Sequence, residues 1–194
     1  PDDPFTTASN TTLTVSFFNS GLQVNDQVRF TDVKSPVGGV SVDALQLQTT
    51  LNGAITTTDT TITLTSTTNF PTAGFIMIES VNKDTASSSY GSFQNEVIQY
   101  TGISGSDLTG CTRATSVPYR GNTLTKTTAY AHPTASTVFG LFKVASLIET
   151  SYVNDANTTV YEYNSFTLTL ANAASGTETG GGFNCFVGPL NERP

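Results

Sequence analysis

The chain has 194 residues, of which 37% are hydrophobic and only 12% charged, and this length allows one ordinary domain or two small ones with a buried core. The formal net charge is -7, and the eight Lys and Arg residues are scattered, so they form no basic stripe that would neutralise phosphates, and nucleic acid is excluded as an expected ligand. The acidity also opposes binding to an anionic membrane surface, and no apolar run approaches the ~20 residues of a membrane-spanning helix, so the sequence predicts a soluble protein.

The first 50 residues predict short β-strands and one stretch of helical spacing. Residues 12–17 and 27–31 alternate apolar and polar side chains, which is typical of half-buried strands, and a turn at 19–21 separates them. Residues 42–51 carry apolar side chains at spacings that hint at a helix, although Gln and Thr residues interrupt them.

The central segment predicts a small β-domain of Thr-rich strands and tight turns. Residues 60–65 alternate strictly, residues 75–78 form an apolar run, and residues 95–100 form a further strand before a Gly-rich turn at 104–110. Because Thr suits the half-exposed face of a pleated sheet, the composition favours a β-sandwich or a β-barrel.

The last third of the chain predicts further strands. Residues 139–148 are the most apolar stretch, and they indicate either a strand buried on both faces or a strand with a bulge at Gly140. A turn at 154–157 precedes an alternating strand at 165–170, and a final strand is expected at 183–187.

Four motifs of the central segment carry a resemblance. They are Asn69-Phe-Pro71, Glu96-Val-Ile98-Gln-Tyr100-Thr-Gly102, Leu108-Thr-Gly-Cys-Thr-Arg113 and Ala131-His132. Their order is similar to that of modules in tail, baseplate and fibre proteins of tailed bacteriophages, including phages of marine cyanobacteria.

The two ends of the chain resemble a second phage tail module, which the central segment interrupts. Residues 19–30 match its opening, with Ser20 where the family has His and Asn25 where it has Gly. The fold can absorb the second change because Asn tolerates a positive φ. Residues 166–187 match its closing strand, its glycine cluster and its last strand.

These resemblances imply an all-β fold in which one module is inserted into another. The outer module is a small β-barrel or β-sandwich that is split between residues 1–50 and residues 146–194. The inserted Thr-rich β-module covers residues 51–145.

The function that the resemblance implies is assembly without catalysis. The chain resembles a non-enzymatic structural component of a tailed-phage virion, associated with the tail, baseplate or fibre and assembled in the host cytoplasm. The expected partners are other virion proteins and copies of the chain itself, because virions repeat their parts around symmetry axes. The alternatives are a capsid decoration protein, a receptor-binding adhesin module that holds a host glycan, and a secreted bacterial adhesin repeat.

The ionisable residues give little support for an enzyme. The single histidine, His132, is interpreted as a turn or strand-end residue, and one histidine excludes the usual multi-histidine metal sites. Glu79 and Glu96 would face each other across neighbouring strands, but no Trp is present to line a sugar site, so both are interpreted as solvated strand-edge carboxylates. We therefore predict no catalytic residue, no cofactor and no metal site. Five further oxygen-bearing residues are interpreted as turn residues and not as calcium ligands: Asn82, Asp84, Asp107, Asn154 and Asp155.

Two loops, residues 80–93 and 114–128, are longer than the resemblance requires. Contacts usually reside in loops on a rigid β-scaffold. Tyr90 and Tyr119 would either form a surface for carbohydrate or protein, or pack against the strands. The candidate interaction residues are Lys83, Tyr90, Phe93, Tyr119, Arg120 and Tyr130.

The two cysteines, Cys111 and Cys185, are expected to be free buried thiols. They fall in different expected modules, and a protein that is assembled inside a cell keeps its thiols reduced. Residues 1–5 also lack the basic and apolar regions of a secretory signal.

Overall fold

The computed structural model describes residues 5–7, 10–16, 21–31, 42–120, 122–124, 128–174 and 184–187. Strands make up 49% of the structure and helix 4%, which confirms the all-β fold class. The strands of the described residues form antiparallel sheets, and none of these sheets closes into a barrel. Among the same residues, no helix has the length and the apolar character that crossing a bilayer requires.

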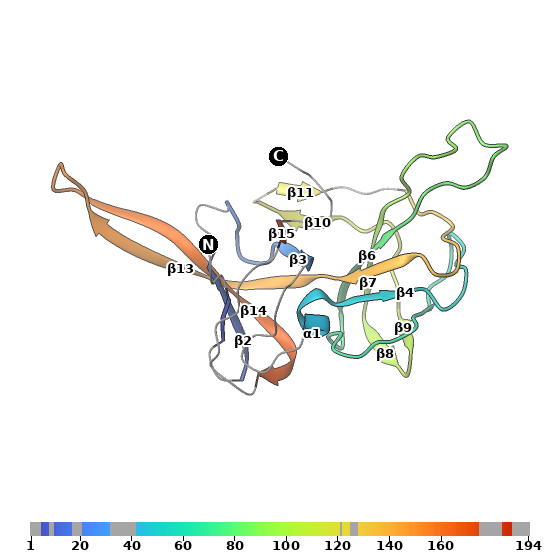
Figure 1. Cartoon of the computed structure of the whole chain (residues 1–194), viewed down its shortest axis with the longest axis horizontal. Coiled ribbons are helices and arrows are strands. Elements are labelled where there is room, and N and C mark those ends of the chain that lie inside the picture. The colour runs from blue at the N-terminus through green and yellow to red at the C-terminus, as the bar shows by residue number, and fades with distance from the viewer. Residues whose placement is uncertain are drawn as a thin grey trace.

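A six-stranded sheet contains strands from both the first and the last part of the chain (Figure 1). Its strands, in spatial order from one edge to the other, are β1 (Phe5–Thr7), β2 (Asn10–Ser16), β14 (Thr159–Ala174), β13 (Phe142–Val153), β3 (Gln27–Thr31) and β15 (Asn184–Val187). The strands predicted at 12–17, 27–31, 165–170 and 183–187 all contribute to this sheet. The division of the chain into two nested modules stays a prediction.

The middle of the chain builds the remaining sheets. The four-stranded sheet contains β4 (Gln48–Thr50), β12 (Thr137–Gly140), β6 (Gly74–Glu79) and β7 (Glu96–Tyr100). The three-stranded sheet contains β5 (Ile62–Thr63), β9 (Asp107–Thr109) and β8 (Gly102–Ser104), and a separate hairpin pairs β10 (Val117–Tyr119) with β11 (Asn122–Leu124).

The helical spacing at 42–51 produces only one short helix, α1 (Val42–Gln46). Leu47 has a φ of 46°, which ends the helix, and its N–H donates to the carbonyl oxygen of Asp43 at 2.9 Å. The residues that follow form β4, because Gln48 pairs with Phe139 of β12. The helix prediction is therefore wrong for the second half of that segment.

The apolar stretch at 139–148 is interrupted. β12 ends at Gly140 and β13 begins at Phe142, while the N–H of Gly140 donates to the carbonyl oxygen of Leu47 at 2.8 Å. The register shifts in β13 fall between Val144 and Ser146 and between Ile148 and Glu149. The segment is therefore neither a strand buried on both faces throughout nor a strand with its bulge at Gly140.

The central sheet is buried on both faces. Ile76 and Ile78 of β6 belong to the main core, whereas Met77 between them belongs to a second apolar cluster with Val97 and Phe139. Burial on both faces explains why residues 75–78 form a continuous apolar run. The main core also contains Phe30 and Phe142 of the six-stranded sheet, whose ring centroids lie 5.6 Å apart, so it extends from the terminal strands to the central sheets.

The hairpin of β13 and β14 is longer than its sheet. The pairing of Ser165 with Ser16 is the outermost contact between β14 and β2, and the register of β13 with β14 continues outward to Val153 and Thr159. Figure 1 shows this two-stranded ribbon projecting away from the rest of the molecule. We call residues 149–163 the arm.

The turn predicted at 154–157 is confirmed at the tip of the arm. The side-chain oxygen of Asn154 accepts hydrogen bonds from the N–H groups of Ala156 at 3.1 Å and Thr158 at 3.0 Å. This arrangement lets the Asn side chain replace a backbone acceptor and closes the hairpin.

Candidate functional site

The loop at 80–93 exposes three of the candidate interaction residues. Lys83 is exposed, Tyr90 is 60% exposed and Phe93 is 78% exposed. Of the two alternatives for Tyr90, the structure therefore shows the surface position. Figure 1 shows this loop, between β6 and β7, projecting from the molecule on the side opposite the arm.

The hairpin of β10 and β11 holds two further candidates. Tyr119 pairs with Asn122 through the backbone, and its side chain lies outside the described atoms. Arg120 is exposed, has a φ of 46°, and its N–H donates to Oδ2 of the buried Asp26 at 2.8 Å. The hairpin is thus anchored to the segment that precedes β3.

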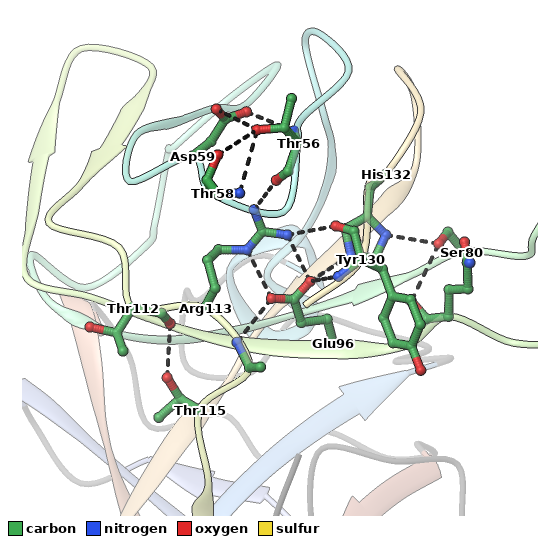
Figure 2. A network of polar contacts seen from close by, with 12 residues as sticks. Thr56, Thr58, Asp59, Ser80, Glu96, Thr112, Arg113, Thr115, Tyr130 and His132 are labelled. Atoms are coloured by element: carbon green, nitrogen blue, oxygen red, sulfur yellow. Dashed lines mark hydrogen bonds and ion pairs between the residues drawn. The ribbon is translucent and has the colours of Figure 1, made fainter. Parts of the chain in front are cut away.

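The carboxylate of Glu96 is the centre of a buried polar network (Figure 2). Oε1 accepts hydrogen bonds from Nε of Arg113 at 2.8 Å and from the N–H of Ala114 at 2.9 Å. Oε2 accepts hydrogen bonds from Nη2 of Arg113 at 2.7 Å, the N–H of Tyr130 at 3.0 Å and Nε2 of His132 at 3.0 Å. With five donors and no solvent exposure, Glu96 is not the solvated strand-edge carboxylate that the sequence suggested.

Arg113 connects this carboxylate to two distant segments. Its Nη2 also donates to the carbonyl oxygen of Tyr130 at 2.7 Å, and its Nη1 donates to the carbonyl oxygen of Thr56. The guanidinium therefore binds Glu96 in a bidentate pair and two backbone carbonyls at once, which is the geometry that favours Arg over Lys. The sixth candidate, Tyr130, lies half-buried beside this network and contributes its backbone to it.

His132 extends the network to Ser80. The Nδ1 atom of its ring lies 2.8 Å from Oγ of Ser80, and because a carboxylate only accepts hydrogen bonds, the Nε2 atom carries the proton that faces Glu96. His132 also forms an isolated backbone bridge with Ile55 and is 1% exposed. It is therefore a buried, fully bonded histidine, and the expectation of an ordinary turn residue does not describe its environment.

The pKa of Glu96 follows from these contacts. Burial alone raises the pKa of a carboxyl group, but hydrogen bonds from His132, Arg113 and the N–H of Tyr130 outweigh it and lower the pKa to about 2. Glu96 is consequently ionised at any ordinary pH, and its charge is balanced by Arg113.

Ser80, His132 and Glu96 form a hydrogen-bonded series in the same chemical order as a serine hydrolase triad. In such enzymes the histidine must reach the leaving group of a bound substrate. Here His132 is only 1% exposed, and the carboxylate is saturated by five donors. We therefore interpret this series as structural. Together with Arg113 it holds the loops around β7 in place, and we call Ser80, Glu96, Arg113 and His132 the clamp.

Glu79 takes part in a different ion pair. Its Oε1 atom accepts a hydrogen bond from Nη2 of Arg29 at 2.9 Å, and its side chain is 27% exposed. The Arg29 guanidinium carbon also lies 4.4 Å from the ring centroid of Phe139. Glu79 and Glu96, which the sequence placed on neighbouring strands, thus each form an ion pair with a different arginine.

The thiol of Cys111 is free and 5% exposed, as expected. Its Sγ donates a hydrogen bond to the carbonyl oxygen of Leu108 at 3.4 Å. Burial raises the pKa of this thiol to about 11. Cys185 lies on β15, and its side chain is outside the described atoms.

Asn82 and Asp84 bind the backbone of their own turn, whereas Asp107 begins β9 and its Oδ1 accepts a hydrogen bond from the Thr63 hydroxyl at 2.6 Å. The side-chain oxygen of Asn82 accepts from the N–H of Asp84 at 2.9 Å, and Oδ1 of Asp84 accepts from the N–H of Ala86 at 3.0 Å. Within the described ranges, no group of three or more His, Cys, Asp or Glu side chains is placed to hold a metal ion.

The arm exposes large apolar side chains on both of its faces. Tyr152 is 49% exposed, and Val153 and Tyr161 are 62% and 64% exposed. Val153 and Tyr161 share one face because Tyr161 lies opposite Ser151, two residues before Val153, whereas Tyr152 points to the other face.

Neither the clamp nor the exposed surface of the arm was predicted from the sequence. A signal for the clamp was present, since Glu96 begins the apolar strand β7 in a segment with few charges and Arg113 is the next basic residue along the chain. A charge beside a buried strand usually has a partner.

The chain was also compared with known proteins. No family model, no curated protein and no solved structure matches it.

Proposed function

We propose that this protein is a non-enzymatic structural component of a tailed-phage virion, associated with the tail, baseplate or fibre, and that it acts through protein–protein contacts. The sequence motifs that resemble phage tail modules support this proposal. The structural observation that carries it is the arm, a projecting β-ribbon with exposed Tyr152, Val153 and Tyr161.

The arm has the properties of an element that a partner covers. An isolated two-stranded ribbon is marginally stable in water, because it lacks a third strand or a packed face. Contiguous exposed apolar side chains on a soluble protein usually mark a contact surface. A partner that buries the arm would cover the exposed Val153 and Tyr161.

The clamp around Glu96 supports a rigid scaffold. It joins β7 to the segments at Thr56, Arg113 and Tyr130 through charged hydrogen bonds that exclude water. A scaffold of this kind would keep the long loop at 80–93 and the arm at fixed positions, which assembly into a symmetric particle requires.

The proposal is tested by complementing a phage that lacks the gene with variants of it. The tyrosine double variant carries Tyr152→Ser and Tyr161→Ser in the arm, and the control Tyr90→Ser removes a similarly exposed tyrosine from the loop at 80–93. We expect the tyrosine double variant to be absent from purified virions and the control to be incorporated at the wild-type level. Normal incorporation of the tyrosine double variant would contradict the proposal.

A receptor-binding adhesin is the second candidate, because Tyr90 and Phe93 form an exposed aromatic pair on one loop. The same experiment separates the two functions. If virions with Tyr90→Ser assemble but no longer adsorb to the host, the loop holds a receptor. A capsid decoration protein would use the same kind of contacts as a tail protein, and its position on the particle distinguishes it.

A further inference from the structure

A groove lies beside the strands from which the arm extends. It encloses about 420 Å³, within the range that holds an organic ligand or a few side chains. Its apolar lining comes mainly from Phe75, Leu141, Phe142 and Leu170. Among the described residues that line it, Lys143 is the one with a charged side chain.

The arm of the same molecule cannot fill this groove. Lys143 and Val153 belong to one continuous strand, β13, and a strand advances about 3.3 Å per residue, so the two residues lie roughly 30 Å apart along it. The paired strand β14 stiffens the ribbon over this length. The groove and the tip of the arm therefore lie at opposite ends of one β-hairpin.

The charges of the two surfaces are complementary. From Val144 to Ala174 the chain carries the acidic residues Glu149, Asp155 and Glu162 and no Lys or Arg. The part of the groove that the described residues line presents Lys143 and no acidic side chain. Direct pairing of two arms would instead bring acidic side chains against each other, which is unfavourable.

We infer that the arm of one copy docks into the groove of a second copy, with Val153 and Tyr161 on the apolar lining and the acidic side chains of the arm near Lys143. This inference rests on the proposed assembly function and names the partner of the arm. The contact joins two different surfaces, so repeating it from copy to copy produces a ring if the rotation closes and a filament if it does not.

Sedimentation velocity of the full chain tests the inference. The wild type is expected to associate as its concentration rises. The arm variant Val153→Asp and the groove variant Lys143→Glu each weaken association by tenfold or more. Val153→Asp would bury a charge against the apolar lining, and Lys143→Glu would repel the acidic side chains of the arm. The control Phe93→Ser changes an exposed apolar residue of the loop at 80–93 and is expected to associate like the wild type.

An equimolar mixture of the arm variant and the groove variant gives the sharpest result. The arm variant keeps an intact groove and the groove variant keeps an intact arm, so the mixture is expected to recover wild-type affinity for one contact and to yield pairs of unlike copies. Circular dichroism of each variant verifies that the fold is retained, since both substituted residues are exposed.

Three outcomes would overturn the inference. In the first, the wild type stays monomeric at its highest soluble concentration. In the second, the mixture of the two variants fails to form pairs. In the third, the arm variant loses association while the groove variant keeps it, which would indicate contact between two arms. A monomeric chain that is nevertheless present in virions would leave the proposed function standing, whereas absence from virions would remove that function whatever the chain does in solution.

Discussion

The guanidinium of Arg113 binds the carboxylate of Glu96 through two parallel hydrogen bonds, from Nε to Oε1 at 2.8 Å and from Nη2 to Oε2 at 2.7 Å. The two side chains are 7% and 0% exposed, so the pair is removed from water. Removing one partner of a buried pair leaves an uncompensated charge, which is far more costly than losing a surface salt bridge.

The substitution Glu96→Gln is therefore expected to lower the free energy of unfolding by about 3–5 kcal/mol, because Arg113 would stay buried without its counter-charge. Urea denaturation measures the change. Glu149→Gln is the matched control, since Glu149 is exposed on the arm, and we expect little change from it. Equal stability of the two variants would contradict the role assigned to Glu96.

Acid is expected to weaken the fold through the same carboxylate. The pKa of Glu96 is lowered from 4.5 to about 2 in the folded protein, so its contribution is complete above about pH 4.5 and is lost as the pH falls from there toward 2. The loss amounts to a few kcal/mol. Denaturation midpoints measured across this range are expected to fall less steeply in Glu96→Gln than in the wild type, and parallel curves would show that other groups dominate.

Replacing Gly140 by a larger residue is expected to destabilise the fold. A Cβ atom at this position would lie 2.9 Å from Cβ of Leu47 and 3.0 Å from the ring of Phe70. Overpacking of this kind costs about 1–3 kcal/mol, so Gly140→Ala should lower the thermal midpoint. Gly53→Ala has no atom within 4 Å of the new methyl group and serves as the control. If Gly140→Ala and Gly53→Ala have the same thermal midpoint, the close approach of Gly140 to Leu47 does not restrict the size of residue 140.

Cys111 is expected to be inert in the native protein. Burial raises the pKa of its thiol to about 11, and only the thiolate reacts with disulfide reagents. In a Cys185→Ser background, labelling should therefore require unfolding of the chain. Rapid labelling without denaturant would show that the thiol is accessible.

The strands of this protein were largely predictable because their signals are local. Alternating side chains around Leu13 and Val15 gave β2, and both residues are fully buried. Asn25 was expected to adopt a positive φ in place of Gly, and its φ is 77°. Turn chemistry at Asn154 likewise needs only its immediate neighbours.

The clamp and the arm were not predictable because each depends on distant contacts. Glu96 meets its partners 17 to 36 residues away along the chain, and nothing near it in the sequence specifies them. Tyr152 and Tyr161 resemble core residues in an alternating strand, and their exposure follows only from the point at which β2 stops pairing with β14. The interruption at Gly140 depends on Leu47, nearly a hundred residues earlier in the chain.

We propose that a tailed phage encodes this chain, and quantitative mass spectrometry of the purified virions of that phage tests the proposed function most directly. We predict that the chain is present at a fixed number of copies per particle and that this number matches a symmetry axis of the tail or baseplate. Virions that infect normally but contain none of the chain would contradict the account.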